Sequence, residues 1–152
     1  MLRISKLTDY GTVILARLAQ DPGLQFTATQ LAQATHVPLA TVSKLLKQLQ
    51  RHALVSSTRG LHGGYRLARS PEMITAAEVL DALEGPVALT ECSSHPNQCG
   101  IESSCGVNRA WQKVNTAIRR TLSEITLMEL AGLAAEPIRF AALDRQLQQA
   151  RR

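Results

Sequence analysis

The amino-acid sequence predicts a mainly α-helical protein that carries a small β-hairpin and one long helix towards its C-terminal end. Apolar residues recur at spacings of three and four over most of the chain, and a glycine-rich stretch separates two short β-type segments. The last periodic stretch covers about 25 residues. With 152 residues, 45% of them hydrophobic and 19% charged, the chain suits one compact domain with an appended element.

The first two helices are predicted from an apolar stripe and from a capping motif. The stripe of the first helix consists of Ile4, Leu7, Gly11, Ile14, Leu15 and Leu18. A turn at residues 21–23 ends this helix. Thr27-Ala28-Thr29-Gln30 has the pattern of a capping box, in which the Thr27 and Gln30 side chains each accept a hydrogen bond from a free backbone N–H. It opens a short helix that runs to about Ala34.

The third helix is predicted to start at Pro38, because the first helical position tolerates proline. Its buried stripe is Val42, Leu45, Leu46 and Leu49, and its opposite face presents Thr41, Lys44, Lys47, Gln48 and Arg51. Short polar and basic side chains of this kind suit a DNA major groove, where hydroxyls and amides contact base edges and cations contact phosphates. Two short helices joined by a tight turn, the second of them basic, indicate a helix-turn-helix.

A basic hairpin is predicted directly after this helix. Residues 54–59 and 65–67 read as strands around a connection that contains three glycines. A hairpin in this position is a wing. Arg59 near its tip is placed to enter a minor groove. His62, at the same tip, is expected to be solvated or to contact a phosphate, because no second metal ligand lies near it in the sequence.

The charge distribution also indicates a nucleic-acid partner. Residues 22–71 contain six Lys or Arg residues and no Asp or Glu, whereas the whole chain has a net charge of +5. A carboxylate that faced a phosphate backbone would weaken binding, so a long stretch without acids favours DNA. The alternative from charge alone is a solvated basic face.

A second capping box, Thr75-Ala76-Ala77-Glu78, predicts a fourth helix that Gly85-Pro86 ends. After a cysteine-bearing loop, one helix of about 38 Å is predicted over residues 106–130. Its stripe is Val107, Trp111, Val114, Ile118, Leu122, Ile125 and Met128. A helix this long is expected to pack against its twin in a two-fold dimer. The alternative is that the stripe packs on the first helix of its own subunit.

All three cysteines of the chain, Cys92, Cys99 and Cys105, lie within 14 residues. The start of the chain lacks the pattern of a secretory leader and no run of 18 apolar residues occurs, so we expect a cytoplasmic protein. In a reducing compartment clustered thiols favour metal binding or redox sensing over a structural disulfide. The spacing favours an iron-sulfur cluster over zinc, whose knuckles use closer pairs, and bare reactive thiols remain the third reading.

The order of these elements resembles the iron-sulfur-cluster-sensing winged-helix regulators typified by IscR and NsrR, and most of all the branch that regulates the SUF cluster-assembly operon. The motifs that carry the resemblance are the start at residues 2–11, Gly60-Leu61-His62-Gly63-Gly64-Tyr65-Arg66-Leu67 in the wing, and the three cysteines. The resemblance covers nearly residues 1–132. It implies a homodimeric repressor of cluster-assembly genes whose cysteines hold a cluster, with [2Fe-2S] favoured over [4Fe-4S].

The resemblance leaves the fourth ligand of such a cluster open. In the IscR branch a histidine follows the last cysteine by three residues, and here that position is Asn108, a poor iron ligand. Asp9 matches a carboxylate that the partner subunit supplies in the nitric-oxide-sensing branch. His95, inside the loop, is the rival, and Glu102 comes third. We prefer Asp9 over His95, because a lone histidine in a polar loop is more often solvated.

Taken together, the sequence predicts a winged helix-turn-helix domain at 1–86, a cysteine loop at 87–106, a dimerisation helix at 107–132 and a helical tail at 133–152. The expected partners are a palindromic operator in double-stranded DNA and a second copy of the chain, without a membrane or a small-molecule substrate. An enzyme is not expected, because the chain has no nucleotide-binding glycine loop, nucleophile elbow or His-Glu-x-x-His pattern.

Overall fold

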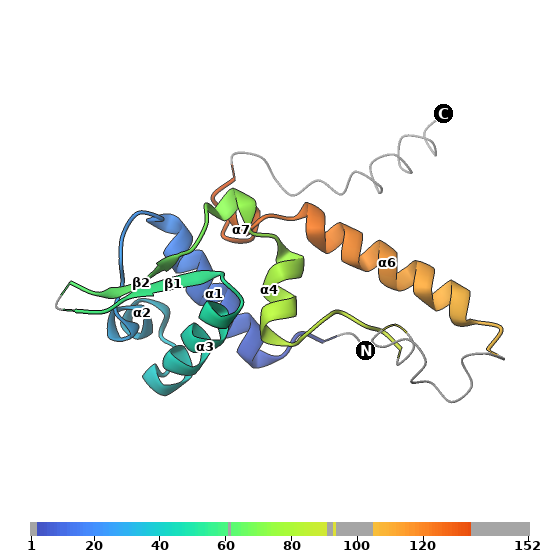
Figure 1. The fold of residues 1–152 in the computed structure, drawn as a ribbon, viewed down its shortest axis with the longest axis horizontal. Helices are drawn as coiled ribbons and strands as arrows, with labels where there is room; N and C mark the ends of the chain where they lie inside the picture. Colours follow the sequence, from blue (N-terminus) through green and yellow to red (C-terminus); the bar gives the residue numbers. More distant parts are fainter. Residues whose placement is uncertain (1–2, 61, 91–92, 94–104, 135–152) are drawn as a thin grey trace.

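The computed structural model describes residues 3–60, 62–90, 93 and 105–134, and within them it shows a winged-helix body from which one long helix projects (Figure 1). The body contains α1 (Lys6–Gln20), α2 (Ala28–Thr35), α3 (Leu39–Arg51), β1 (Val55–Thr58), β2 (Gly64–Leu67), the 3-10 turn η1 (Pro71–Met73) and α4 (Ala76–Leu83). The projecting helix is α6 (Asn108–Glu124), and α7 (Leu127–Leu130) returns the chain to the body. The predicted fold class, mainly helical with a small hairpin, is confirmed.

Helix α1 forms the centre of the body, with Ile14, Leu15 and Leu18 at most 1% exposed. Its start differs from the prediction. Ser5 is the N-cap, and its hydroxyl accepts a hydrogen bond from the Thr8 backbone N–H. Ile4 therefore lies before the helix and is not part of its buried face. Ile4 is 61% exposed and Leu7 is 41% exposed, so the buried part of the predicted stripe begins only at Gly11.

The helix-turn-helix forms as predicted. Both halves of the Thr27 capping box are present at the start of α2. The turn that follows passes through His36, whose φ of 57° is left-handed. Pro38 is the N-cap of α3 and not its first helical residue, a shift of one position. Helix α3 then packs its four predicted apolar residues into the core, each at most 1% exposed.

The wing is a two-stranded antiparallel hairpin in which Val55 pairs with Leu67 and Thr58 pairs with Gly64. Phe26, before α2, extends the pairing, because it exchanges two backbone hydrogen bonds with Tyr65 at 2.9 and 2.8 Å. A side chain on Gly64 would contact the Phe26 backbone at 2.9 Å, so glycine is needed where the third segment approaches. The hairpin is thereby fixed to the start of the helix-turn-helix through the half of β2 that lies nearer its tip.

The single long helix predicted for residues 106–130 is wrong at its C-terminal end, since α6 stops at Glu124 and a new short helix starts at Leu127. Thr126 caps α7 in a capping box with Glu129. The break also satisfies backbone groups of the body: the Ala76 N–H donates to the Ile125 carbonyl at 2.8 Å, and the Leu127 N–H donates to the Ile74 carbonyl at 2.7 Å. These bonds anchor the end of α6 and bury Leu127 in the core.

Helix α6 touches the body along α4, and the apolar residues of its outer half are exposed within the described part of the chain. Ile118 and Leu122, in its C-terminal half, are half-buried, whereas Val107 is 59% exposed, Trp111 45% and Val114 43%. Bidentate hydrogen bonds from Arg119 to Asp81, at 2.9 and 2.6 Å, fasten α6 to α4. In the part of the chain that the structure describes, no helix is long and apolar enough to cross a membrane.

Candidate nucleic-acid interface and cysteine segment

The exposed face of α3 carries the cations of the predicted DNA surface. Lys44, Lys47 and Arg51 are all exposed, at spacings of three and four on one face of the helix. Because the opposite face is packed into the body, these three side chains have fixed starting points on a rigid element. An exposed row of cations on a helix of 13 residues matches the dimensions of a major groove.

Gln48 and Thr41 lie at the flank of this face, towards α4. The Gln48 side-chain amide donates hydrogen bonds to the carbonyl oxygens of Ala82 and Leu83, at 3.0 and 3.1 Å. Both donors of the Gln48 amide are thus used within the protein, which argues against the prediction that Gln48 contacts DNA. Thr41 is half-buried on the same side of α3. Periodicity identified the polar face but could not show that α4 covers one edge of it.

Gln50 is a surface residue of α3 that the sequence reasoning missed. Its side-chain amide donates to the Ser57 hydroxyl on β1 at 2.9 Å. This bond lies at a cleft of about 390 Å³ between α3 and the wing, whose lining includes Lys47, Arg59 and Tyr65. The Gln50 bond links the exposed helix to the wing, so the two DNA-facing parts form one surface. The sequence could have indicated Gln50 through its position, three residues after Lys47 on the same helix.

The wing places Arg59 and His62 at its outer end, and both are exposed. Arg59 directly follows β1, and His62 belongs to the connection before β2. Nearby acids are engaged elsewhere: the carboxylate of Asp21 accepts from Arg17 at 2.8 Å, and that of Glu78 accepts from Arg69 at 2.8 Å. Among the residues that the structure describes, no carboxylate forms an ion pair with Lys44, Lys47, Arg51 or Arg59, so the surface formed by α3 and the wing is positively charged.

The cysteine segment lies mostly outside the described residues: Cys92, Cys99, His95 and Glu102 all belong to the undescribed part. Cys105 is described; it is a free thiol and half-buried, just before α6. Within the described ranges, no three His, Cys, Asp or Glu side chains come together in a way that could hold a metal ion. The predicted ligand set therefore stays a prediction.

Two observations bear on whether the residues present fit a cluster. Three thiols within 14 residues are the donor type that iron-sulfur clusters use. Three residues after Cys105, the Asn108 side-chain oxygen is buried and accepts no hydrogen bond from the described residues. The same holds for the Asn115 side-chain oxygen, seven residues further along α6. Orphaned buried oxygens of this kind are uncommon, so we expect a donor outside the described residues to complete them. The three thiols are the donors that fit the cluster.

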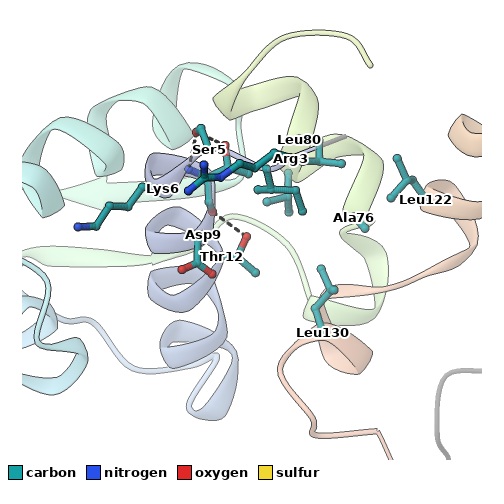
Figure 2. Close-up of a pocket in the computed structure, with 12 residues that line it drawn as sticks. Arg3, Ser5, Lys6, Asp9, Thr12, Ala76, Leu80, Leu122 and Leu130 are labelled. Carbon is teal, nitrogen blue, oxygen red and sulfur yellow. Dashed lines mark hydrogen bonds between the residues drawn. The ribbon is translucent and has the colours of Figure 1, made fainter. Parts of the chain in front are cut away.

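Asp9, the preferred fourth ligand, is exposed on α1. It lies at the rim of a hollow of about 460 Å³, which is enclosed by the start of α1, by α4 and by the ends of α6 and α7. Figure 2 shows Asp9 and Thr12 on the α1 side, with Leu80 of α4, Leu122 of α6 and Leu130 of α7 around the same space. Helix α6 leads away from this hollow, so its first turn lies far from α1 (Figure 1).

The helix-turn-helix, the fixed wing and the exposed cations of α3 define a winged-helix DNA-binding protein. Comparison with known proteins agrees. The family model described as "Rrf2: Iron-dependent Transcriptional regulator" matches residues 4–132. The chain belongs to the Rrf2 family of transcriptional regulators, so the expectation that it is not an enzyme is confirmed.

Individual relatives are likewise described as transcriptional regulators. The HTH-type transcriptional regulator CymR of Bacillus subtilis is 30% identical over 132 residues, which cover 86% of this chain and 91% of that protein. Its structure, described as that of the global cysteine regulator, superposes with a TM-score of 0.68 over 88% of this chain and 99% of that one. NsrR of Halalkalibacterium halodurans is 28% identical over 131 residues, 85% of this chain and 90% of that protein.

A third relative is known from a solved structure. T. potens IscR superposes with a TM-score of 0.61 at 26% identity, over 99% of this chain and 92% of that one. The resemblance to IscR- and NsrR-type regulators that the sequence motifs indicate is thereby confirmed at the level of the family.

Proposed function

We propose that this Rrf2-family regulator is a homodimeric repressor that binds a palindromic operator, and that an iron-sulfur cluster on Cys92, Cys99 and Cys105 sets its affinity for DNA. The regulated genes would be those that assemble iron-sulfur clusters. The observation that carries the DNA-binding part is the exposed cationic face of α3, joined to a basic wing in a stretch of 50 residues without a carboxylate.

In this proposal Lys44, Lys47 and Arg51 contact phosphates and base edges of the major groove, with Thr41 at the margin. Arg59 enters the neighbouring minor groove, and His62 contacts the backbone at the tip of the wing. Gln48 is left out, because its amide is bound to α4. Binding would weaken steeply with salt, since each cation that neutralises a phosphate releases a counterion.

The dimer is supported by the outer half of α6. Val107, Trp111 and Val114 form an exposed apolar stripe on a helix that projects from the body. A second copy related by a two-fold axis would cover this stripe, and it would place two copies of α3 against half-sites about 34 Å apart. The geometry of α6 relative to the body then determines the separation of the two reading helices.

The cysteine segment connects the end of α4 to the start of α6, so its conformation acts on both. A bound cluster supplies an oxygen- and redox-sensitive crosslink of the three thiolates. Cys105 lies just before the first turn of α6, at the outer end of this helix, and its position would fix how that turn is held. Because α6 leads away from α1, Asp9 would act as fourth ligand only from the partner subunit; His95 remains the rival.

A second candidate is a thiol switch without a metal. The free, half-buried thiol of Cys105 supports it, since such a thiol can be oxidised once it is deprotonated. A zinc-stapled regulator without a sensing role is the third candidate.

Protein purified without oxygen separates these candidates. We expect visible absorption between about 320 and 460 nm, with matching iron and acid-labile sulfide, and its loss in the Cys105→Ala variant. A colourless protein without iron after reconstitution would refute the cluster, and zinc content would then distinguish the staple from the thiol switch. Asp9→Ala beside His95→Ala tests the fourth ligand through the shift of the absorption bands.

A further inference from the structure

The last turn of α4 is bound to α3 through Gln48. The final carbonyls of a helix lack partners within the helix. Here the Glu84 and Gly85 N–H groups donate to the Leu80 and Asp81 carbonyls, at 2.8 and 3.2 Å. The Ala82 and Leu83 carbonyls receive the two donors of the Gln48 amide, at 3.0 and 3.1 Å. A side chain of the proposed reading helix thus completes the C-terminal end of α4.

The same turn is bound to α6 and to α1. The Asp81 carboxylate accepts both hydrogen bonds of the Arg119 guanidinium, which fastens the projecting helix. The Glu84 carboxylate accepts from the Ser5 backbone N–H at 2.7 Å and from the Thr8 hydroxyl at 2.6 Å. Four consecutive residues therefore contact three different helices.

Close packing leaves this turn little freedom to move alone. A Cβ atom on Gly11 of α1 would lie 2.5 Å from a methyl carbon of Leu83, so the two helices are as near as a glycine permits. A displacement of α6 therefore acts on a turn that is also bound to α1 and α3.

We propose that residues 81–84, the α4 hub, couple α6 to the reading helix, and that Gln48 is the positioning residue of this coupling. Gln48 holds α3 at a fixed orientation to the hub and makes no contact with DNA. When α6 moves, α3 moves with it. The inference rests on the proposed use of α3 as the reading helix.

The test is amide hydrogen exchange of the full-length protein, free and saturated with a duplex that the wild type selects from a random library. In the wild type, DNA on α3 is expected to slow exchange of the Glu84 and Gly85 amides at least fivefold. Gln48→Met, which keeps the shape and removes the donors, is expected to lose this slowing. The control Gln20→Met, at the exposed end of α1, keeps it.

Two further variants separate coupling from packing. Gln48→Lys again supplies N–H donors to the hub carbonyls and is expected to restore the slowing, which a change in packing alone would not do. Arg119→Met breaks the other side of the hub. It is expected to abolish the DNA-induced slowing across α6 and to leave that at Glu84 intact. This second result does not require that a Gln48 variant folds.

The outcomes also separate this inference from the proposed function. Lys44→Ala is expected to weaken DNA binding about tenfold; unchanged affinity would refute α3 as the reading helix, and the coupling with it. If Lys44→Ala weakens binding but Gln48→Met keeps the slowing at Glu84, only the coupling is refuted. If Gln48→Met keeps the slowing and weakens binding as Lys44→Ala does, Gln48 contacts DNA itself and the inference is wrong.

Discussion

Replacing Trp111 by alanine is expected to disrupt the dimer and to leave the fold of the subunit intact. Trp111 is 45% exposed in the outer half of α6. A tryptophan presents about 250 Å² of surface, so about 110 Å² per subunit is available to a partner. At about 25 cal/mol per Å², its complete burial in both subunits would contribute about 5 to 6 kcal/mol to the dimer. Partial coverage leaves about 3 kcal/mol, or about a hundredfold in the dissociation constant.

Sedimentation velocity over a range of protein concentrations measures this change. Met73→Ala is the matched control, since Met73 is 66% exposed on η1, which lies at the body end of α6 and not at its outer half. We expect Met73→Ala to dimerise as the wild type does. Trp111→Ala should dissociate into monomers at protein concentrations at least a hundredfold higher than those at which the wild type dissociates. Equal dissociation constants for Trp111→Ala and the wild type would refute the assignment of this stripe to the dimer interface.

Three other substitutions test details of the body. A methyl group on Gly63 would clash with the backbone carbonyl oxygen of Thr58, so Gly63→Ala should deform the wing and weaken DNA binding about tenfold in a titration. Ala53 has a left-handed φ of 54°, so Ala53→Gly should raise the free energy of unfolding by about 0.5 to 1 kcal/mol in urea. The Thr8 hydroxyl and the Ser5 N–H lower the pKa of Glu84 below its ordinary 4.5, so Glu84 stabilises the fold above that pH. This contribution is lost as the pH falls through the folded pKa, and Glu84→Gln should flatten that part of the urea-stability profile.

Each of these has a control or a contrary result. Gly23→Ala, where a methyl group meets no atom within 4 Å, should bind DNA as the wild type does. A less stable Ala53→Gly protein would mean that backbone entropy outweighs the relieved strain. An acid profile of Glu84→Gln that coincides with the wild type would show that the hydrogen bonds from α1 do not contribute to stability.

Local signals predicted most of the winged-helix body. The Thr27 and Thr75 capping boxes start helices where the sequence placed them, because each motif satisfies free N–H groups within one turn of chain. The same signal at Thr126 and Glu129 was overlooked, since the apolar stripe of α6 continues through Ile125. The break there depends on backbone pairing with residues 74–76, about 50 positions earlier in the chain, which no local pattern reveals.

The candidate site was predicted less completely, for a related reason. Periodicity identified the polar face of α3, but it could not show that the Gln48 amide binds α4, 34 residues further along the chain. The exposed position of the α3 cations follows from the helical period alone, and this exposure was predicted correctly. The ligand set of the cysteines depends on a segment outside the described residues and on a second subunit, so it remains a prediction.

The most direct test of the proposed regulation compares operator affinity with and without the cluster. Protein purified without oxygen is titrated against the selected duplex by fluorescence anisotropy, before and after a chelator removes the iron, with Cys105→Ala alongside. We predict affinities that differ at least tenfold, about 1.4 kcal/mol, and a variant that binds as the chelated protein does. Equal affinities in a sample with full iron and sulfide content would contradict the claim that the cysteine segment controls DNA binding.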